Sequence, residues 1–128
     1  RGFEEVVPML LSDFYDGGSM IERWDIGDRL YTIKSQKYID DYLKIISNPK
    51  YGVDRQMFVL LVGELKIEKA IPILINLLDD QDVTGHAINA LGRYKDNNLF
   101  SFFERYLNHK NSFYRREAKK AINKLNKK

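Results

Sequence analysis

The residues best suited to chemistry in this sequence are two histidines and a few closely spaced aspartates. His86 and His109 are the only histidines among the 128 residues, and the sequence contains no cysteine. It also contains no HExxH pair, zinc-ligand spacing, glycine-rich phosphate loop or nucleophile elbow. Disulfides, thiolate zinc sites and cysteine nucleophiles are excluded together. We therefore expect a non-enzymatic protein with no catalytic residues, no metal and no cofactor.

Two groups of aspartates come closest to a functional site. Asp25 and Asp28 are one helical turn apart, a spacing that fits a carboxylate pair for proton transfer but more often marks a solvated acidic surface. Residues 80–85 have the start of a calcium-binding pattern, yet Leu91 occupies the twelfth place, where a bidentate glutamate is needed. We interpret the aspartates of residues 79–82 as turn and cap residues, and we reject a calcium site.

These residues lie on helices that recur along the chain. The segment Thr84-x-x-Ala87-x-x-Ala90-Leu91-Gly92 matches one that begins 31 residues later, one that begins 29 residues earlier and one a further 32 residues back. A helix with apolar residues at i, i+3 and i+6 or i+7 precedes each copy. The copies begin at Arg23, Arg55, Thr84 and Arg115.

The spacing predicts eight helices, at about 3–16, 20–33, 36–47, 53–66, 69–79, 83–94, 98–109 and 113–126. Pro8 and Pro72 fit first helical turns, where the missing N–H has no intrahelical partner. A capping box is expected from Ser19 to Glu22. Further N-caps are expected at Ser35, Asp82, Asn97 and Ser112.

Antiparallel helix pairs that bury their faces on their neighbours stack into an α-solenoid, and at least three pairs are needed for stability. We predict an all-α fold, a right-handed α-solenoid of four antiparallel helix pairs. It forms a single domain over residues 1–128, with repeats at about 1–34, 35–66, 67–95 and 96–128. Small residues on the second helices allow a close approach; these are Ala87, Ala90, Ala118 and Ala121.

An apolar first helix that ends in Asp, followed by Arg-x-x-Ala-x-x-Ala-Leu-Gly, resembles the short HEAT-like repeats of bacterial HEAT-repeat proteins and of the phycobilisome-lyase type. The resemblance is clearest over Ala70 to Tyr94. The sequence departs from it at Thr84, where the family usually has Arg, and at Arg29 and Tyr31, where it has Ala and Gly.

The resemblance implies a role for the recurring arginines. In such repeats the matching side chain bonds to an inter-helix aspartate or carbonyl and ties the repeats together. If they are exposed instead, Arg23, Arg55 and Arg115 form a ladder for an anionic ligand. The resemblance also implies that the second helices line the concave side of the stack.

The register defines an inner face from the positions that point away from the core. It comprises Trp24, Asp25, Asp28 and Thr32, then Gln56, Met57, Leu60 and Glu64, then Gly85, His86, Asn89 and Arg93, then Arg116, Glu117, Lys120 and Lys124. The face changes from acidic, through partly apolar, to basic. Trp24 fits either packing on a first helix or a binding hot spot. Met57 and Leu60 form an exposed apolar patch, unless the register is shifted by one residue and buries them.

The net charge of +3 is unevenly distributed. Residues 110–128 carry eight basic residues and one acidic residue, a net +7, which leaves −4 for residues 1–109. Such polarity steers charged partners without fixing a fold. The longest apolar stretch, Met57 to Val62, is too short to span a membrane, and no secretory signal is recognised. We expect a cytoplasmic chain.

The leading interpretation is a protein-interaction or scaffold module that binds a protein or peptide on its concave face. The alternative is nucleic-acid binding through the basic C-terminal repeat, because some HEAT-like proteins are DNA glycosylases with Trp, Asp and Arg in the groove. The nearest counterparts here are Trp24, Asp25 and Arg93. A third interpretation, a chromophore-lyase accessory protein, is suggested only by the name of the repeat, and the sequence has no pigment-binding motif.

Overall fold

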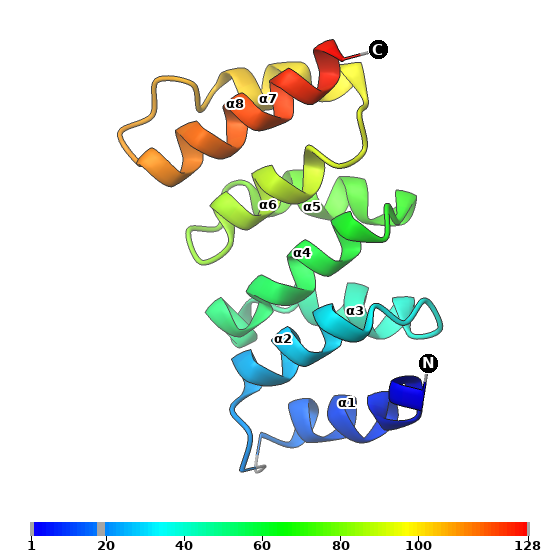
Figure 1. Cartoon of the computed structure of the whole chain (residues 1–128). Helices are drawn as coiled ribbons and strands as arrows, with labels where there is room; N and C mark the ends of the chain where they lie inside the picture. Colours follow the sequence, from blue (N-terminus) through cyan, green and yellow to red (C-terminus); the bar gives the residue numbers. More distant parts are fainter. Residues whose placement is uncertain (1, 18–19, 128) are drawn as a thin grey trace.

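The computed structural model describes residues 2–17 and 20–127 of the chain, and these residues form helix pairs stacked in one direction (Figure 1). Within this part of the chain there are eight α-helices and no strand. The first helices of the pairs are α1 (Val7–Asp16), α3 (Ile39–Ile46), α5 (Ile71–Leu77) and α7 (Phe100–Glu104). The second helices are α2 (Arg23–Ile33), α4 (Gln56–Glu64), α6 (Thr84–Leu91) and α8 (Ser112–Asn126). The predicted all-α solenoid is confirmed.

The first helices are shorter than predicted because their ends tighten into 3₁₀ turns. Four 3₁₀ segments precede α-helices: η1 (Gly2–Val6), η2 (Pro49–Arg55), η3 (Glu68–Ala70) and η4 (Asn97–Leu99). After α5 the amide of Leu78 donates to the carbonyl of Ile75 three residues back, and after α7 the amide of Tyr106 donates to that of Phe103. The apolar period therefore continues beyond the α-helical hydrogen bonds.

Side chains with an amide or carboxylate begin several elements, usually one residue before the predicted position. Asp96 and Asn111 accept the amides of Asn98 and Phe113, so the N-caps expected at Asn97 and Ser112 were each wrong by one residue. The Ser35 hydroxyl accepts the Lys37 amide at 3.3 Å and donates to Glu4 at 2.6 Å, but α3 begins only at Ile39, after Tyr38. Val83 stands at the N-cap of α6 in place of Asp82 and gives no side-chain bond. Ser19 of the predicted capping box lies outside the described residues.

Small residues let the second helices pack closely along the stack. Ala87 and Ala90 are fully buried, and a Cβ added at Gly63 of α4 would lie 2.6 Å from the Cα of Ala90 in α6. A Cβ added at Gly92 would lie 2.9 Å from the Cβ of Ala121 in α8. Glycine is required at Gly63 because any side chain would meet the backbone of the next repeat. The second helices α2, α4, α6 and α8 form one continuous column (Figure 1). Each first helix packs on the second helix of its own repeat.

The predicted apolar stripes of the first helices form the rest of the core, with one exception. Leu74 of α5 and Phe103 of α7 are buried, whereas Phe100, at the start of α7, is 41% exposed. Pro8 and Pro72 lie in the first turns of α1 and α5, as predicted.

Each of the first three second helices is followed by a lysine in the left-handed backbone region. Lys34, Lys66 and Lys95 have φ of 57°, 52° and 53°, a conformation that usually favours glycine or asparagine. A lysine at a helix C-terminus places its positive charge near the negative end of the helix dipole, which offsets part of the conformational cost. The chain thus turns into the next repeat at the same structural position three times.

Candidate functional site

An arginine at the start of the second repeat's second helix joins two repeats. Arg55 is only 1% exposed, and it donates to the carbonyls of Gly52 at 2.9 Å and Ile46 at 3.2 Å. Its Nη2 donates to Asp80 of the next repeat at 2.6 Å. Burial alone would raise the pKa of Asp80, but the hydrogen bonds from Arg55 and from the Asp82 amide outweigh it and hold that pKa below its usual value.

Arg23 and Arg115 make the equivalent bonds within their repeats. Arg23 donates to the carbonyls of Phe14 at 2.6 Å and Tyr15 at 3.1 Å, and Arg115 donates to that of His109 at 2.6 Å. The predicted carbonyl bonds are confirmed for all three arginines, whereas a bond that ties adjacent repeats together is found only for Arg55 among the residues that the structure describes. Their guanidinium groups are engaged by the fold, so they do not form an exposed ladder for an anion.

The predicted inner face lies along the second helices, but only part of it is open to solvent. The exposed members are Trp24, Asp25, Asp28, Thr32, Arg116 and Lys120. The half-buried members are Gln56, Met57, Leu60, Glu64, His86, Asn89, Arg93 and Lys124. Gly85 and Glu117 are buried, so their assignment to an open face was wrong. The ring of Phe113 covers Gly85, and Glu117 turns toward the preceding repeat to accept a hydrogen bond from Asn89.

Polar side chains of this face bond to one another across the repeats. The Trp24 indole N–H donates to Gln56 Oε1 at 3.1 Å, and the Gln56 amide donates to the Asp82 carbonyl at 2.9 Å. Glu64 and Arg93, at equivalent positions of repeats 2 and 3, form an ion pair at 2.9 Å. The middle of the face is therefore fixed by bonds between adjacent repeats.

The last two repeats continue these bonds around a buried carboxylate. Asn89 donates to Glu117 at 2.8 Å, and Lys120 pairs with Glu117 at 3.1 Å. The ring of His86 meets that of Phe113 edge-on, with centroids 5.5 Å apart. Burial lowers the pKa of His86, and the charge of Glu117 opposes only part of that shift. His86 is thus favoured in its neutral form.

The apolar and basic parts of the face differ in how freely they can meet a partner. Trp24 is 37% exposed, and its N–H is bonded to Gln56 of the second helix α4. Met57 and Leu60 are half-buried, which makes the apolar patch smaller than an exposed pair would give. At the basic end, burial and the charges of Arg93 and Lys120 lower the pKa of Lys124.

The arrangement does not assemble the groove residues of the glycosylase alternative. Trp24 bonds to Gln56. Arg93 lies two repeats after Trp24 and is paired with Glu64. Within residues 2–17 and 20–127, no group of three or more His, Cys, Asp or Glu side chains could hold a metal ion. None of the helices described is long and apolar enough to cross a membrane.

The family model for HEAT repeats matches residues 33–125, which is most of the chain. The chain belongs to the HEAT repeat family. HEAT repeats are generally scaffolds for protein interactions and are typically not enzymes. Neither a curated protein nor a solved structure matches the chain at a significant level.

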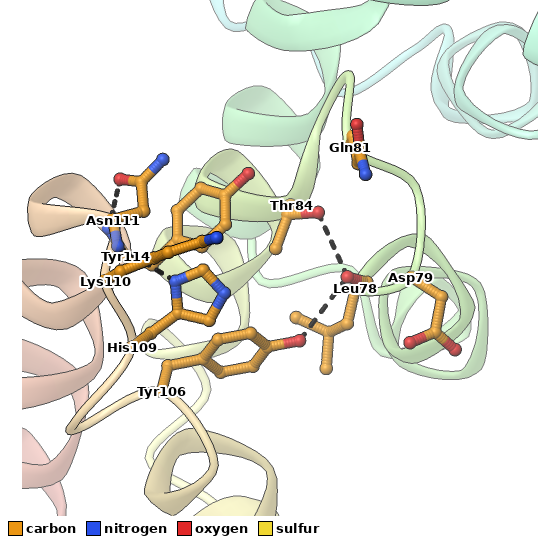
Figure 2. A pocket seen from close by; sticks show the side chains of 9 residues that line it. All are labelled: Leu78, Asp79, Gln81, Thr84, Tyr106, His109, Lys110, Asn111 and Tyr114. Atoms are coloured by element: carbon orange, nitrogen blue, oxygen red, sulfur yellow. Dashed lines mark hydrogen bonds between the residues drawn. The ribbon is translucent and has the colours of Figure 1, made fainter.

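One cavity of this HEAT-repeat chain was not predicted from the sequence. It lies at the turns between the paired helices of repeats 3 and 4, with a volume of about 650 Å³ (Figure 2). The only sequence signal for it is the departure from the repeat pattern at Thr84, whose side chain lines it. The other lining residues are Leu78, Asp79, Gln81, Tyr106, His109, Lys110, Asn111 and Tyr114.

Proposed function

We propose that this HEAT-repeat chain is a non-enzymatic protein-interaction module that holds a segment of a partner protein along its second-helix face. The second helices approach one another more closely than the first helices do. A stack spaced more closely on one side curves toward that side, which supports a concave second-helix face.

The observation that carries the proposal is the charge difference between the two exposed ends of that face. Asp25 and Asp28 are exposed at the first repeat, and Arg116 and Lys120 are exposed at the last. A partner segment that is basic at one end and acidic at the other would bind in one orientation, because the reverse places like charges together.

The fixed middle of the face supports the same function. Gln56, Glu64 and Arg93 already have partners within the chain, so binding would not require them to be ordered again. A surface that is ordered before binding loses less conformational entropy when a partner docks. Trp24, exposed beside the acidic end, is the residue type most often found in binding hot spots.

Charge reversal at each end tests the proposal. The immobilised chain is used to capture proteins from its native cell extract, and recovery is quantified by mass spectrometry. We expect a partner of the wild type to be lost with Asp25→Lys/Asp28→Lys and with Arg116→Glu/Lys120→Glu. A matched control, Glu5→Lys/Glu104→Lys, reverses two exposed charges away from this face and should retain the partner. Equal recovery by all four proteins would refute the proposed face.

Nucleic-acid binding is a second candidate because Arg116 and Lys120 are exposed and the last repeat is basic. Each phosphate contact contributes a slope of about −0.9 to the dependence of log affinity on log salt concentration. A labelled DNA duplex titrated at two salt concentrations distinguishes the functions. Tight binding with a steep slope, abolished by Arg116→Glu/Lys120→Glu, would favour nucleic acid over a protein partner.

A further inference from the structure

In each repeat, a residue at the start of the second helix bonds a backbone carbonyl near the end of the first helix or in the turn that follows it. In repeats 1, 2 and 4 this residue is an arginine, and the bonded carbonyls are those of Phe14, Ile46 and His109. In repeat 3 the equivalent carbonyl belongs to Leu78. There the hydroxyl of Thr84 takes the arginine's place and lies within hydrogen-bond distance of two carbonyl oxygens, that of Leu78 at 3.0 Å and that of Asp80 at 2.8 Å. Threonine satisfies the carbonyl without filling the space that a guanidinium group would occupy.

The first two repeats show what surrounds a guanidinium at this position. Arg23 lies over the rings of Phe14 and Tyr51, with its central carbon 5.6 Å and 5.2 Å from their centroids. Arg55 pairs with the carboxylate of Asp80. A backbone carbonyl, an aromatic ring and a carboxylate are all groups that bind a guanidinium favourably.

The third repeat has the same kinds of groups around an open cavity (Figure 2). The rings of His109 and Tyr114, with centroids 5.0 Å apart, come from the fourth repeat. The ring of Tyr106 lies 6.0 Å from that of Tyr114 and points its hydroxyl at the Leu78 carbonyl. Asp79 lines the opposite side, and no ion pair or side-chain hydrogen bond to its carboxylate is found in the described part of the chain.

We propose that this cavity, the arginine slot, binds the guanidinium group of an arginine side chain on a partner peptide. The guanidinium would pair with Asp79 and lie against the ring of Tyr114. Lys110, on the rim beside His109, disfavours a cation at that end and leaves the Asp79 side as the place for the charge. A volume of about 650 Å³ is within the usual range for binding pockets and exceeds the space of one side chain. The slot lies at the turns of the stack, so it does not depend on the second-helix face.

Short peptides titrated into the isotopically labelled chain test the slot by NMR. The probe is acetyl-Gly-Arg-Gly-amide, and its matched control replaces arginine with citrulline, which has nearly the same shape and no charge. We expect the arginine peptide to shift the ring signals of Tyr106, His109 and Tyr114 in a saturable manner. Citrulline should bind about tenfold more weakly or worse, because the charged hydrogen bonds are lost. Equal shifts with both peptides, or a preference for acetyl-Gly-Glu-Gly-amide, would overturn the proposal.

Two substitutions test it from the protein side. Thr84→Arg restores the repeat pattern, and Arg115 shows that an arginine six residues after the carbonyl reaches it at 2.6 Å. This variant should fill the slot and lose the arginine-peptide shifts, whereas Thr84→Ser should retain them. Asp79→Asn, at an exposed position, should weaken binding about tenfold. If a folded Thr84→Arg variant or the Asp79→Asn variant binds the arginine peptide as well as the wild type does, the assignment is refuted.

Discussion

Two junctions of the stack use the same repeat positions but are packed to different extents. One joins repeats 2 and 3, and the other joins repeats 3 and 4. At the first, Arg55 is buried and paired with Asp80, and Gly63 lies against the backbone of Ala90. At the second, Thr84 replaces the arginine and a cavity remains. We infer that the residue type at this repeat position sets how far a junction closes.

The difference matters because each repeat contacts mainly its neighbours. The stability of such a stack is close to a sum of repeat and junction contributions. We infer that the sealed junction holds the middle of the molecule together and that the open junction provides a site.

Loss of the arginine at the sealed junction should have the largest effect. Arg55→Ala removes the guanidinium group that bonds the Asp80 carboxylate and the buried carbonyl of Ile46, and it should lower the free energy of unfolding by about 3 kcal/mol. Arg115→Ala, which removes one bond from a half-buried side chain, should cost about 1 kcal/mol or less. Urea denaturation measures both. Equal losses would show that burial and the ion pair add nothing at the sealed junction.

Replacing the glycine at the sealed junction should destabilise the protein more than replacing the glycine at the open junction. Gly63→Ala drives a Cβ into the Cα, Cβ and carbonyl of Ala90, and overpacking of this kind costs about 2 kcal/mol. Gly92→Ala meets the Cβ of Ala121 at 2.9 Å and its Cα at 3.3 Å, which are longer approaches than those at Gly63, so it should cost less. Thermal unfolding of both variants gives the comparison. A larger loss with Gly92→Ala would mean that the second junction is the tighter one.

Mild acid should weaken the open junction before the sealed one. The pKa of His86 is lowered in the folded state, so the unfolded chain takes up a proton at a higher pH than the folded chain does. His86 therefore contributes fully above its unfolded pKa of about 6.5, and its contribution falls as the pH drops through that value. Unfolding measured at pH 7 and pH 5 should show a decline that His86→Gln reduces.

Asp80 at the sealed junction is an acid, so its contribution to stability changes in a lower pH range than that of His86. Its folded pKa is depressed, so its contribution persists above its unfolded pKa of about 3.9 and is lost as the pH falls through the folded value. A pH 7 to pH 5 decline that is the same in His86→Gln as in the wild type would contradict the assignment to His86.

The smallest effect is expected from the ion pair on the inner face between repeats 2 and 3. Glu64 and Arg93 are each about one-third exposed, so Glu64→Gln should lower the free energy of unfolding by less than about 1 kcal/mol. Raising the salt concentration should shrink the difference between variant and wild type, because salt screens exposed charges. A loss that is large and independent of salt would make this pair, rather than Arg55, the main tie.

The repeat pattern predicted the fold well because it reflects burial, which repeats with the helices. Ala87, Ala90 and Ala118 were predicted to face inward, and each is fully buried. Helix ends were less accurate because the apolar period does not distinguish an α-helical turn from a 3₁₀ turn. Asn111 caps α8 one residue before the predicted Ser112, since both side chains suit that role.

The site could be predicted only in part. The register placed Trp24 and Arg116 on an exposed face, but it could not show that Glu117 turns inward to bond Asn89. Bonds between repeats depend on rotamers and on residues that lie 25 to 33 positions apart in the sequence. The arginine slot had a visible signal, Thr84 in place of Arg, but its aromatic wall comes from the following repeat.

The lysines that follow the first three second helices offer a way to change the protein stepwise. Non-glycine residues in the left-handed region carry a cost of roughly 1 kcal/mol each, part of which glycine recovers. Lys34, Lys66 and Lys95 lie in different repeats, so replacements there should add independently. A graded series of one, two and three glycine variants would yield proteins that share one architecture and differ only in their resistance to heat.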